Sequence, residues 1–128
     1  MLDADERSLI WASGGHDPAV WFHRETGKIE ELPNTGMPIG VVEGATFEQG
    51  GPVLLETGDV VVIGTDGIWE AQNDRGDTFG KERFYEIVKR GGNVSAEEIC
   101  SQVVDQVADF CGPEPQLDDI TLVVIRLL

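Results

Sequence analysis

The sequence is short of cysteine, of positive charge and of long apolar runs. It has 2 cysteines in 128 residues, and 9 Lys and Arg against 24 Asp and Glu, for a formal net charge of −15. So few basic residues disfavour binding to nucleic acid or to an anionic membrane surface, because both contacts need clustered Lys and Arg. No apolar run approaches the roughly 18 residues of a membrane-spanning helix, and no signal peptide opens the chain.

The two cysteines also exclude a disulfide framework. Cys100 and Cys111 fall in one predicted helix, where they lie about 16 Å apart, beyond the reach of a disulfide. No CxxC pair and no His/Cys spacing indicates a zinc site. Reduced thiols are typical of a cytoplasmic protein, which is the location we expect.

The first half of the chain has the pattern of β-structure. Strand-like segments cover residues 8–13, 19–24 and 29–32, and the turn "ETGK" separates the last two. Residues 51–65 hold two further apolar runs, which are broken by the turn signal Thr57-Gly58-Asp59.

The second half changes to a helical period. A helix is predicted over 81–90 and ends at Gly91-Gly92, and a second begins at Ser95, whose spacing to Glu98 is that of a capping box. This second helix carries two adjacent apolar stripes, a width that suits packing on a sheet: Ile99, Val103, Val107 and Phe110, then Cys100, Val104, Ala108 and Cys111.

The last apolar segment, 120–127, predicts a central strand covered on both faces. Such a strand needs several neighbours, and the first strand begins within about eight residues of Met1. We therefore expect residues 1–128 to be part of a larger α+β domain, with largely antiparallel sheets and a helix pair before the last strand.

Aspartates flank two of the apolar strands. Asp66-Gly67 follows the run 60–63, and Asp118-Asp119 precedes 120–127. If these strands pair in antiparallel fashion, Asp66 and Asp118 meet at one sheet edge, where a hard cation such as Mg²⁺ or Mn²⁺ would relieve their repulsion. The alternatives stay open: Asp-Gly also suits a type I′ hairpin turn, and Asp-Asp suits a solvated loop.

His16 lies in the loop "SGGHDPAV" between two predicted strands. A lone loop histidine is more often a hydrogen-bonded structural residue than a metal ligand or base. Trp11, Trp21 and Trp69 are expected to pack in the core or at its edge.

Several motifs, in order, resemble the metal-dependent protein serine/threonine phosphatases (PPM, type 2C), in particular their bacterial SpoIIE/RsbU-like branch. They are "WASGGHDPAVWF", "TGMPIGV", "LLETGDVVVIGTDGIWEAQNDRGDTFG" and "QLDDITLVVIR". The resemblance implies the C-terminal portion of an α-β-β-α sandwich that holds two Mn²⁺ or Mg²⁺ ions, where a metal-bridging water attacks a phosphoserine. It implies Asp66 and Asp118 as metal ligands. Gly67, Asp119 and His16 would surround these ligands and support them without binding the metal directly.

The chain also departs from the resembled family. It lacks the "GGD"-type and "D-x-SGHG"-type motifs that supply the aspartate bridging the two metals. We therefore expect residues 1–128 to be a partial phosphatase domain that binds at most one ion, weakly, and is inactive alone.

The resemblance implies a phosphoprotein substrate, by analogy an anti-anti-sigma factor, and a sensor or receiver domain upstream in the complete protein. Missing strands would leave a sheet uncovered, through which the chain would self-associate. The alternative is a non-catalytic protein-binding or regulatory module. A cupin-type barrel is rejected, because that fold needs several histidines near its metal and the sequence has 2.

Overall fold

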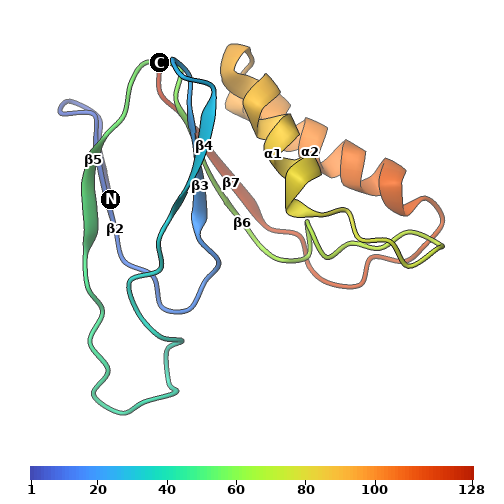
Figure 1. Cartoon of the computed structure of the whole chain (residues 1–128), viewed down its shortest axis with the longest axis horizontal. Helices are drawn as coiled ribbons and strands as arrows, with labels where there is room; N and C mark the ends of the chain where they lie inside the picture. The colour runs from blue at the N-terminus through green and yellow to red at the C-terminus, as the bar shows by residue number, and fades with distance from the viewer.

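The computed structural model describes all of residues 1–128 as three layers: a small sheet, a larger sheet and a pair of helices (Figure 1). The small sheet has the order β1-β2-β5 and the larger one β4-β3-β6-β7, with every pair antiparallel. The strands are β1 (Leu2–Asp3), β2 (Ser8–Trp11), β3 (Ala19–His23), β4 (Lys28–Leu32), β5 (Gly50–Leu54), β6 (Val60–Gly64) and β7 (Leu122–Arg126). The helices are α1 (Lys81–Arg90), the short 3-10 helix η1 (Gly91–Asn93) and α2 (Ala96–Cys111).

The predicted α+β class, the antiparallel sheets and the helix pair before the last strand are confirmed. Neither helix is long and apolar enough to cross a bilayer. Both cysteines are free.

The larger sheet is the middle layer and has a core on each side. Alternation along β3 sends Val20 and Phe22 toward the helices and Trp21 toward the small sheet. The helix-side core is the larger and includes Ile68, Phe79 and the buried side chains of both helices, whereas the core between the sheets is built on Leu9, Trp21, Leu32, Leu55 and Val61. Burial on two faces explains why the sequence of β6 is apolar without interruption.

β7 lies at the edge of its sheet, so the prediction of a central strand is wrong. Its one hydrogen-bonded neighbour is β6, and Val123 is 49% exposed. The apolar run still has a use on both faces, because Leu122 and Val124 pack in the helix-side core and Ile125 packs between the sheets. A continuous apolar run therefore indicates that both faces of a strand are covered. It does not indicate whether the strand is central or at the edge of its sheet.

α2 begins as predicted and packs mainly through one stripe. Ser95 caps the helix, its Oγ accepting the Glu98 N–H at 3.1 Å. Ile99, Val103 and Val107 are buried in the helix-side core, and Phe110 packs against it. Of the neighbouring stripe, Cys111 packs against this core, but Val104 is 49% exposed and Ala108 is exposed as well, so the predicted packing of two full stripes is wrong. α2 lies mainly over the edge strand β7, where the sheet offers no further surface to a second stripe.

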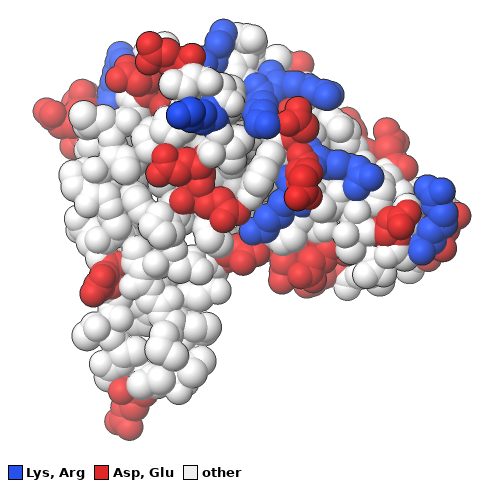
Figure 2. All heavy atoms as spheres, viewed as in Figure 1, with Lys and Arg blue, Asp and Glu red and all other residues white.

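A long segment without regular structure, 33–49, connects β4 to β5 and projects from the sheets (Figure 1). It returns to the loop after β2 through hydrogen bonds from Ser13 N–H to Thr35 Oγ1 and from Ile39 N–H to the Gly14 carbonyl. In Figure 2 this projection is mostly uncharged. Its exposed apolar side chains are Met37, Ile39, Val41, Val42 and Phe47.

The helix-side core provides a matched pair of neighbouring valines for a stability test. Val103→Asp places an unpaired carboxylate where Val103 is 0% exposed, and should cost at least about 3 kcal/mol or prevent folding. Val104→Asp, at the 49% exposed neighbour, should change stability by no more than about 0.5 kcal/mol. Urea unfolding followed by circular dichroism measures both, and equal stabilities for the two variants would refute the packing described here.

Candidate functional site

The pairing of β6 with β7 brings the two aspartate motifs to one edge of the sheet. The register places Gly64 opposite Leu122, so Thr65-Asp66-Gly67 emerges beside the residues that enter β7. The strands stay joined beyond the ladder: Thr65 N–H donates to the Thr121 carbonyl at 3.1 Å, and the Thr65 hydroxyl accepts the Thr121 N–H at 3.0 Å. The same hydroxyl donates to the Asp119 carbonyl at 3.0 Å. The predicted meeting of the Asp66 and Asp118 segments is confirmed.

Asp66 and Gly67 form a turn that leads away from the sheet. The Asp66 carbonyl accepts the Glu70 N–H at 2.8 Å, and its Oδ1 accepts the Gly67 N–H at 3.1 Å. β6 pairs with β3 and β7 and with no strand directly after this turn, so the type I′ hairpin alternative is wrong.

Gly67 is required by close approach. A Cβ at this position would lie 2.5 Å from the Asp119 carbonyl oxygen, closer than real contacts allow. Any side chain would therefore push the turn away from Asp118-Asp119. This packing role is consistent with the predicted supporting position of Gly67.

Asp118 and Asp119 present different groups to the site. Asp118 is exposed, with its Oδ1 accepting the Asp119 N–H at 2.7 Å, and its carbonyl accepts from Gln116 Nε2 at 2.7 Å. Asp119 reaches the turn through its main chain, by the carbonyl that Thr65 bonds, and its exposed carboxylate makes no hydrogen bond. Both aspartates therefore keep carboxylate oxygens free for a ligand.

His16 and Asp66 line the same pocket. This pocket has a volume of about 220 Å³ and no apolar side chain, and its lining residues are Gly15, His16, Asp17, Gly64, Thr65 and Asp66. His16 Nδ1 lies 2.9 Å from the Asp17 carbonyl oxygen. The loop after β2 thus meets the turn after β6, and Asp17 brings a carboxylate to the wall that Asp66 also lines.

Asp118 lines a neighbouring pocket and not the one with His16. That second pocket has a volume of about 390 Å³ and is lined by Gly67, Glu70, Ala71, Gln72, Thr78, Leu117 and Asp118. Segment adjacency was predictable from the motifs, whereas this division between two pockets depends on where each side chain points.

Carboxylate oxygens are the donors that Mg²⁺ and Mn²⁺ prefer, so the type of ligand fits. Asp66 and Asp118 each use one oxygen for the following N–H, and no other hydrogen bond within the chain takes the second oxygen. However, no three His, Cys, Asp or Glu side chains lie close enough together to hold an ion. The residues fit part of a metal centre whose remaining positions would be filled by water or by groups outside this chain.

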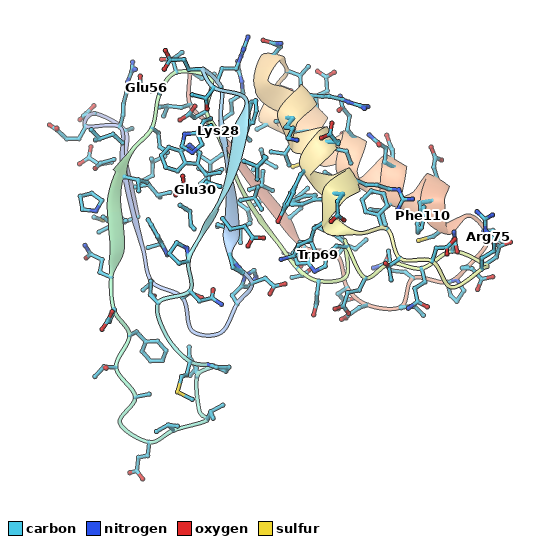
Figure 3. All side chains as sticks on the ribbon, in the orientation of Figure 1. Lys28, Glu30, Glu56, Trp69, Arg75 and Phe110 are labelled. Carbon is cyan, nitrogen blue, oxygen red and sulfur yellow. The ribbon has the colours of Figure 1, made fainter.

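A polar network connects α1 to the segment after Asp66. Lys81 Nζ lies 3.2 Å from Glu31 Oε1 and 5.1 Å from the centroid of the Trp69 ring, which also packs on Phe84. Trp69 lies at the beginning of α1 (Figure 3).

The Tyr85 hydroxyl donates to Glu31, and this hydrogen bond, with a smaller effect from Lys81, holds the pKa of Glu31 below its usual value. Burial and the bond to Glu31 raise the pKa of Tyr85. Trp69 packs at the core edge, as predicted.

The fold is that of PP2C-type phosphatase domains. The SiaA-PP2C domain of Pseudomonas aeruginosa superposes with a TM-score of 0.76 at 24% identity, over 95% of this chain and 47% of that one. The SpoIIE phosphatase domain of Bacillus subtilis, presoaked with Mn, superposes with a TM-score of 0.69 at 17% identity, over 99% of this chain and 54% of that one.

The family comparison is more specific. The Stage II sporulation protein E (SpoIIE) family matches residues 1–128, and the chain belongs to this family. Phosphoserine phosphatase RsbU of Bacillus subtilis (strain 168) is 26% identical over 126 residues, which are 95% of this chain and 36% of RsbU. The resemblance seen in the motifs is confirmed, and the chain spans about a third of that relative's length.

Gly67→Ala tests the close approach at the site. The added methyl meets the Asp119 carbonyl, so we expect separation of the Thr65 and Thr121 segments and a loss of stability of about 1–3 kcal/mol. The control is Gly76→Ala, where a Cβ meets nothing and only the φ of +78° costs energy, about 1–2 kcal/mol. Amide NMR shifts of Thr65 and Thr121 should move in Gly67→Ala alone, and unchanged shifts there would contradict the contact.

Tyr85→Phe tests the polar network. Loss of the hydroxyl should raise the pKa of Glu31 toward its ordinary value of 4.5, with Lys81 retaining part of the effect. The pKa of Glu31 is lower in the folded state than its ordinary value. Its carboxylate therefore stabilises the fold at pH values above that ordinary pKa, and this contribution is lost as the pH falls through the lowered pKa. The variant should therefore lose less stability than the wild type on acidification. NMR titration of the Glu31 side chain measures this pKa in both proteins. The same pKa in Tyr85→Phe and the wild type would contradict the hydrogen bond from Tyr85 to Glu31.

Proposed function

We propose that this chain contributes to the active site of a protein serine/threonine phosphatase and that Asp66 and Asp118 are its metal ligands. The observation that carries the proposal is the joining of their two segments through Thr65, with carboxylate oxygens left free in polar pockets. Family membership supports it, as does the name of RsbU, a phosphoserine phosphatase. The Mn-presoaked crystal of the SpoIIE domain supports Mn²⁺ or Mg²⁺ as the cofactor.

The residues of this chain would have distinct tasks. Asp66 and Asp118 would hold the cation, while Gly67 and the Asp119 main chain fix the spacing of the two segments. His16 and Asp17 would border the space in which the substrate phosphate lies. Bound divalent ions lower the pKa of a coordinated water and neutralise phosphoryl charge. The substrate would be a phosphoserine or phosphothreonine protein, by analogy an anti-anti-sigma factor.

A second candidate is a non-catalytic module of the same fold, which binds a protein without hydrolysing phosphate. The observation favouring it is that the acids of this chain form no three-ligand group. Two divalent cations about 4 Å apart repel by roughly 17 kcal/mol at an effective dielectric near 20, so a two-metal centre needs more ligands than Asp66 and Asp118 provide. The two candidates diverge in a longer protein that contains this chain, where the first predicts turnover.

Asp66→Asn tests the proposal, with Asp74→Asn as the control. Both substitutions remove one exposed carboxylate, but Asp74 lies outside the pockets that Asp66 and Asp118 line. In the 128-residue chain we expect weak binding of one Mn²⁺, weakened roughly tenfold or more by Asp66→Asn alone, and no phosphate release from a phosphoserine peptide. In the longer protein, Asp66→Asn should abolish Mn²⁺-dependent phosphate release.

Mn²⁺ binding is followed by electron paramagnetic resonance and phosphate release by a colorimetric assay. Equal Mn²⁺ affinity in the wild type and Asp66→Asn would overturn the ligand assignment. Metal-dependent turnover by the short chain, lost in Asp66→Asn, would show that these 128 residues already hold the complete machinery.

A further inference from the structure

An apolar pocket lies beside the candidate site and shares no lining residue with the pocket that His16 lines. It has a volume of about 240 Å³ and lies between the second half of α2 and the loop that leads to β7. Its apolar walls include Val104, Val107, Ala108, Cys111 and Ile120. Val107 forms the floor that the pocket shares with the helix-side core, against which Cys111 and Ile120 also pack. Val104 and Ala108 are exposed and take no part in that core.

The apolar pocket adjoins the pocket that Asp118 lines. Four residues line both of them: Gly67, Ala71, Gln72 and Leu117. We call the two adjoining pockets together the depression; its lining extends from Asp118, past Gly67, to α2. A chain segment with its phosphoserine at the aspartates could place a neighbouring side chain against α2.

The charges around this depression are all of one sign. Glu114 lines the apolar pocket, Glu70 and Asp118 line its neighbour, and no Lys or Arg lines either pocket. Figure 2 shows acidic side chains along the lower rim beneath the helices, over the loops that follow β6 and precede β7 in Figure 1, with the basic Arg75 (labelled in Figure 3) at the right end beside Asp77. Such a rim repels acidic segments and attracts basic ones.

We propose that this depression is a specificity subsite for the substrate protein, one that accepts a large aliphatic side chain close to the phosphoserine in a segment that also carries Lys or Arg. The inference rests on the proposed function, since the aspartates define where the phosphoserine lies. Apolar walls stabilise the aliphatic side chain by removing it from water, and the acidic rim selects its basic neighbours. The subsite discriminates substrates by contacts away from the reacting phosphate.

The test is the affinity of short peptides for the 128-residue chain, by fluorescence anisotropy with Mg²⁺. Each peptide carries one phosphoserine and has lysines near both ends. The peptides differ only in the residue directly before the phosphoserine, which is leucine in one and glycine in the other. We expect the leucine peptide to bind roughly tenfold more tightly, the gain from burying most of a leucine side chain. The same pair with unmodified serine should keep this preference at lower affinity.

Two variants remove the subsite and one serves as the control. Ala108→Phe fills the pocket from an exposed position of α2, and Leu117→Ser removes an exposed wall residue shared by both pockets. Each should reduce the leucine preference to less than about threefold. Gln106→Phe adds the same ring to α2 at an exposed position outside both linings and should retain the full preference.

Equal affinity for the leucine and glycine peptides, or a preference that survives both Ala108→Phe and Leu117→Ser, would overturn the subsite. Failure of the proposed function has a different signature: no phosphate release by the longer protein, whatever the peptide preference. A leucine preference that the pocket variants abolish would support the subsite even in that case, because side-chain selectivity is measured without hydrolysis.

Discussion

The antiparallel pairing of β6 with β7 is the constraint on which both the core and the candidate site depend. It joins two segments about sixty positions apart in the sequence, with Val60 opposite Arg126 and Gly64 opposite Leu122. A shift of one residue in this register would turn the apolar side chains of β7 to the wrong faces. The same shift would move the Asp118 segment relative to Asp66, so one ladder specifies both the packing and the arrangement of the candidate site.

The two ends of this ladder are fixed by different means. At the site end, the single hydroxyl of Thr65 donates to the Asp119 carbonyl and accepts the Thr121 N–H. At the far end, the buried carboxylate of Asp59 accepts from Trp21 Nε1, Arg24 N–H and Glu56 N–H. The Asp59 carbonyl also accepts the Leu127 N–H at 3.0 Å. The buried carboxylate is thus satisfied by Trp21 of β3 and by main-chain donors from the turns after β3 and before β6, and it holds these segments together.

Local signals predicted most of the elements, because they act between residues near in the sequence. The capping box at Ser95, the glycines after Arg90 and the turn signal "ETGK" after β3 each concern a few neighbouring positions. The meeting of the Asp66 and Asp118 segments was also predictable. One apolar run is followed by an acid and the other is preceded by one, and antiparallel pairing places the end of the first strand beside the start of the second.

The errors concern quantities that neighbouring residues do not encode. The run in β7 indicates covered faces but not the number of strands beside it. The second stripe of α2 has the composition of a core face, yet the edge of the sheet leaves Val104 exposed. The sequence predicted Asp59 only as part of a turn. No residue next to it indicates that Trp21 and Arg24 approach its carboxylate. The direction of each aspartate side chain likewise depends on packing between segments distant in the sequence.

The electrostatics of the site follow from the scarcity of basic residues. Arg75, Lys81 and Arg83 are the first cations along the chain after Asp66, and each is already engaged elsewhere. Arg75 pairs with Asp77 at 3.6 Å, and Lys81 binds Glu31 and lies over Trp69. Arg83 donates to the main-chain carbonyls of Thr78 and Phe79 and lies over Phe110. Neither Asp66 nor Asp118 has a salt-bridge partner, and no Lys or Arg lines their pockets. A phosphate would meet uncompensated negative charge there, on a chain of net charge −15. Physical chemistry therefore favours a site in which a bound cation, and not a basic side chain, neutralises the phosphate, which is the arrangement that two exposed aspartates at paired strand ends can support.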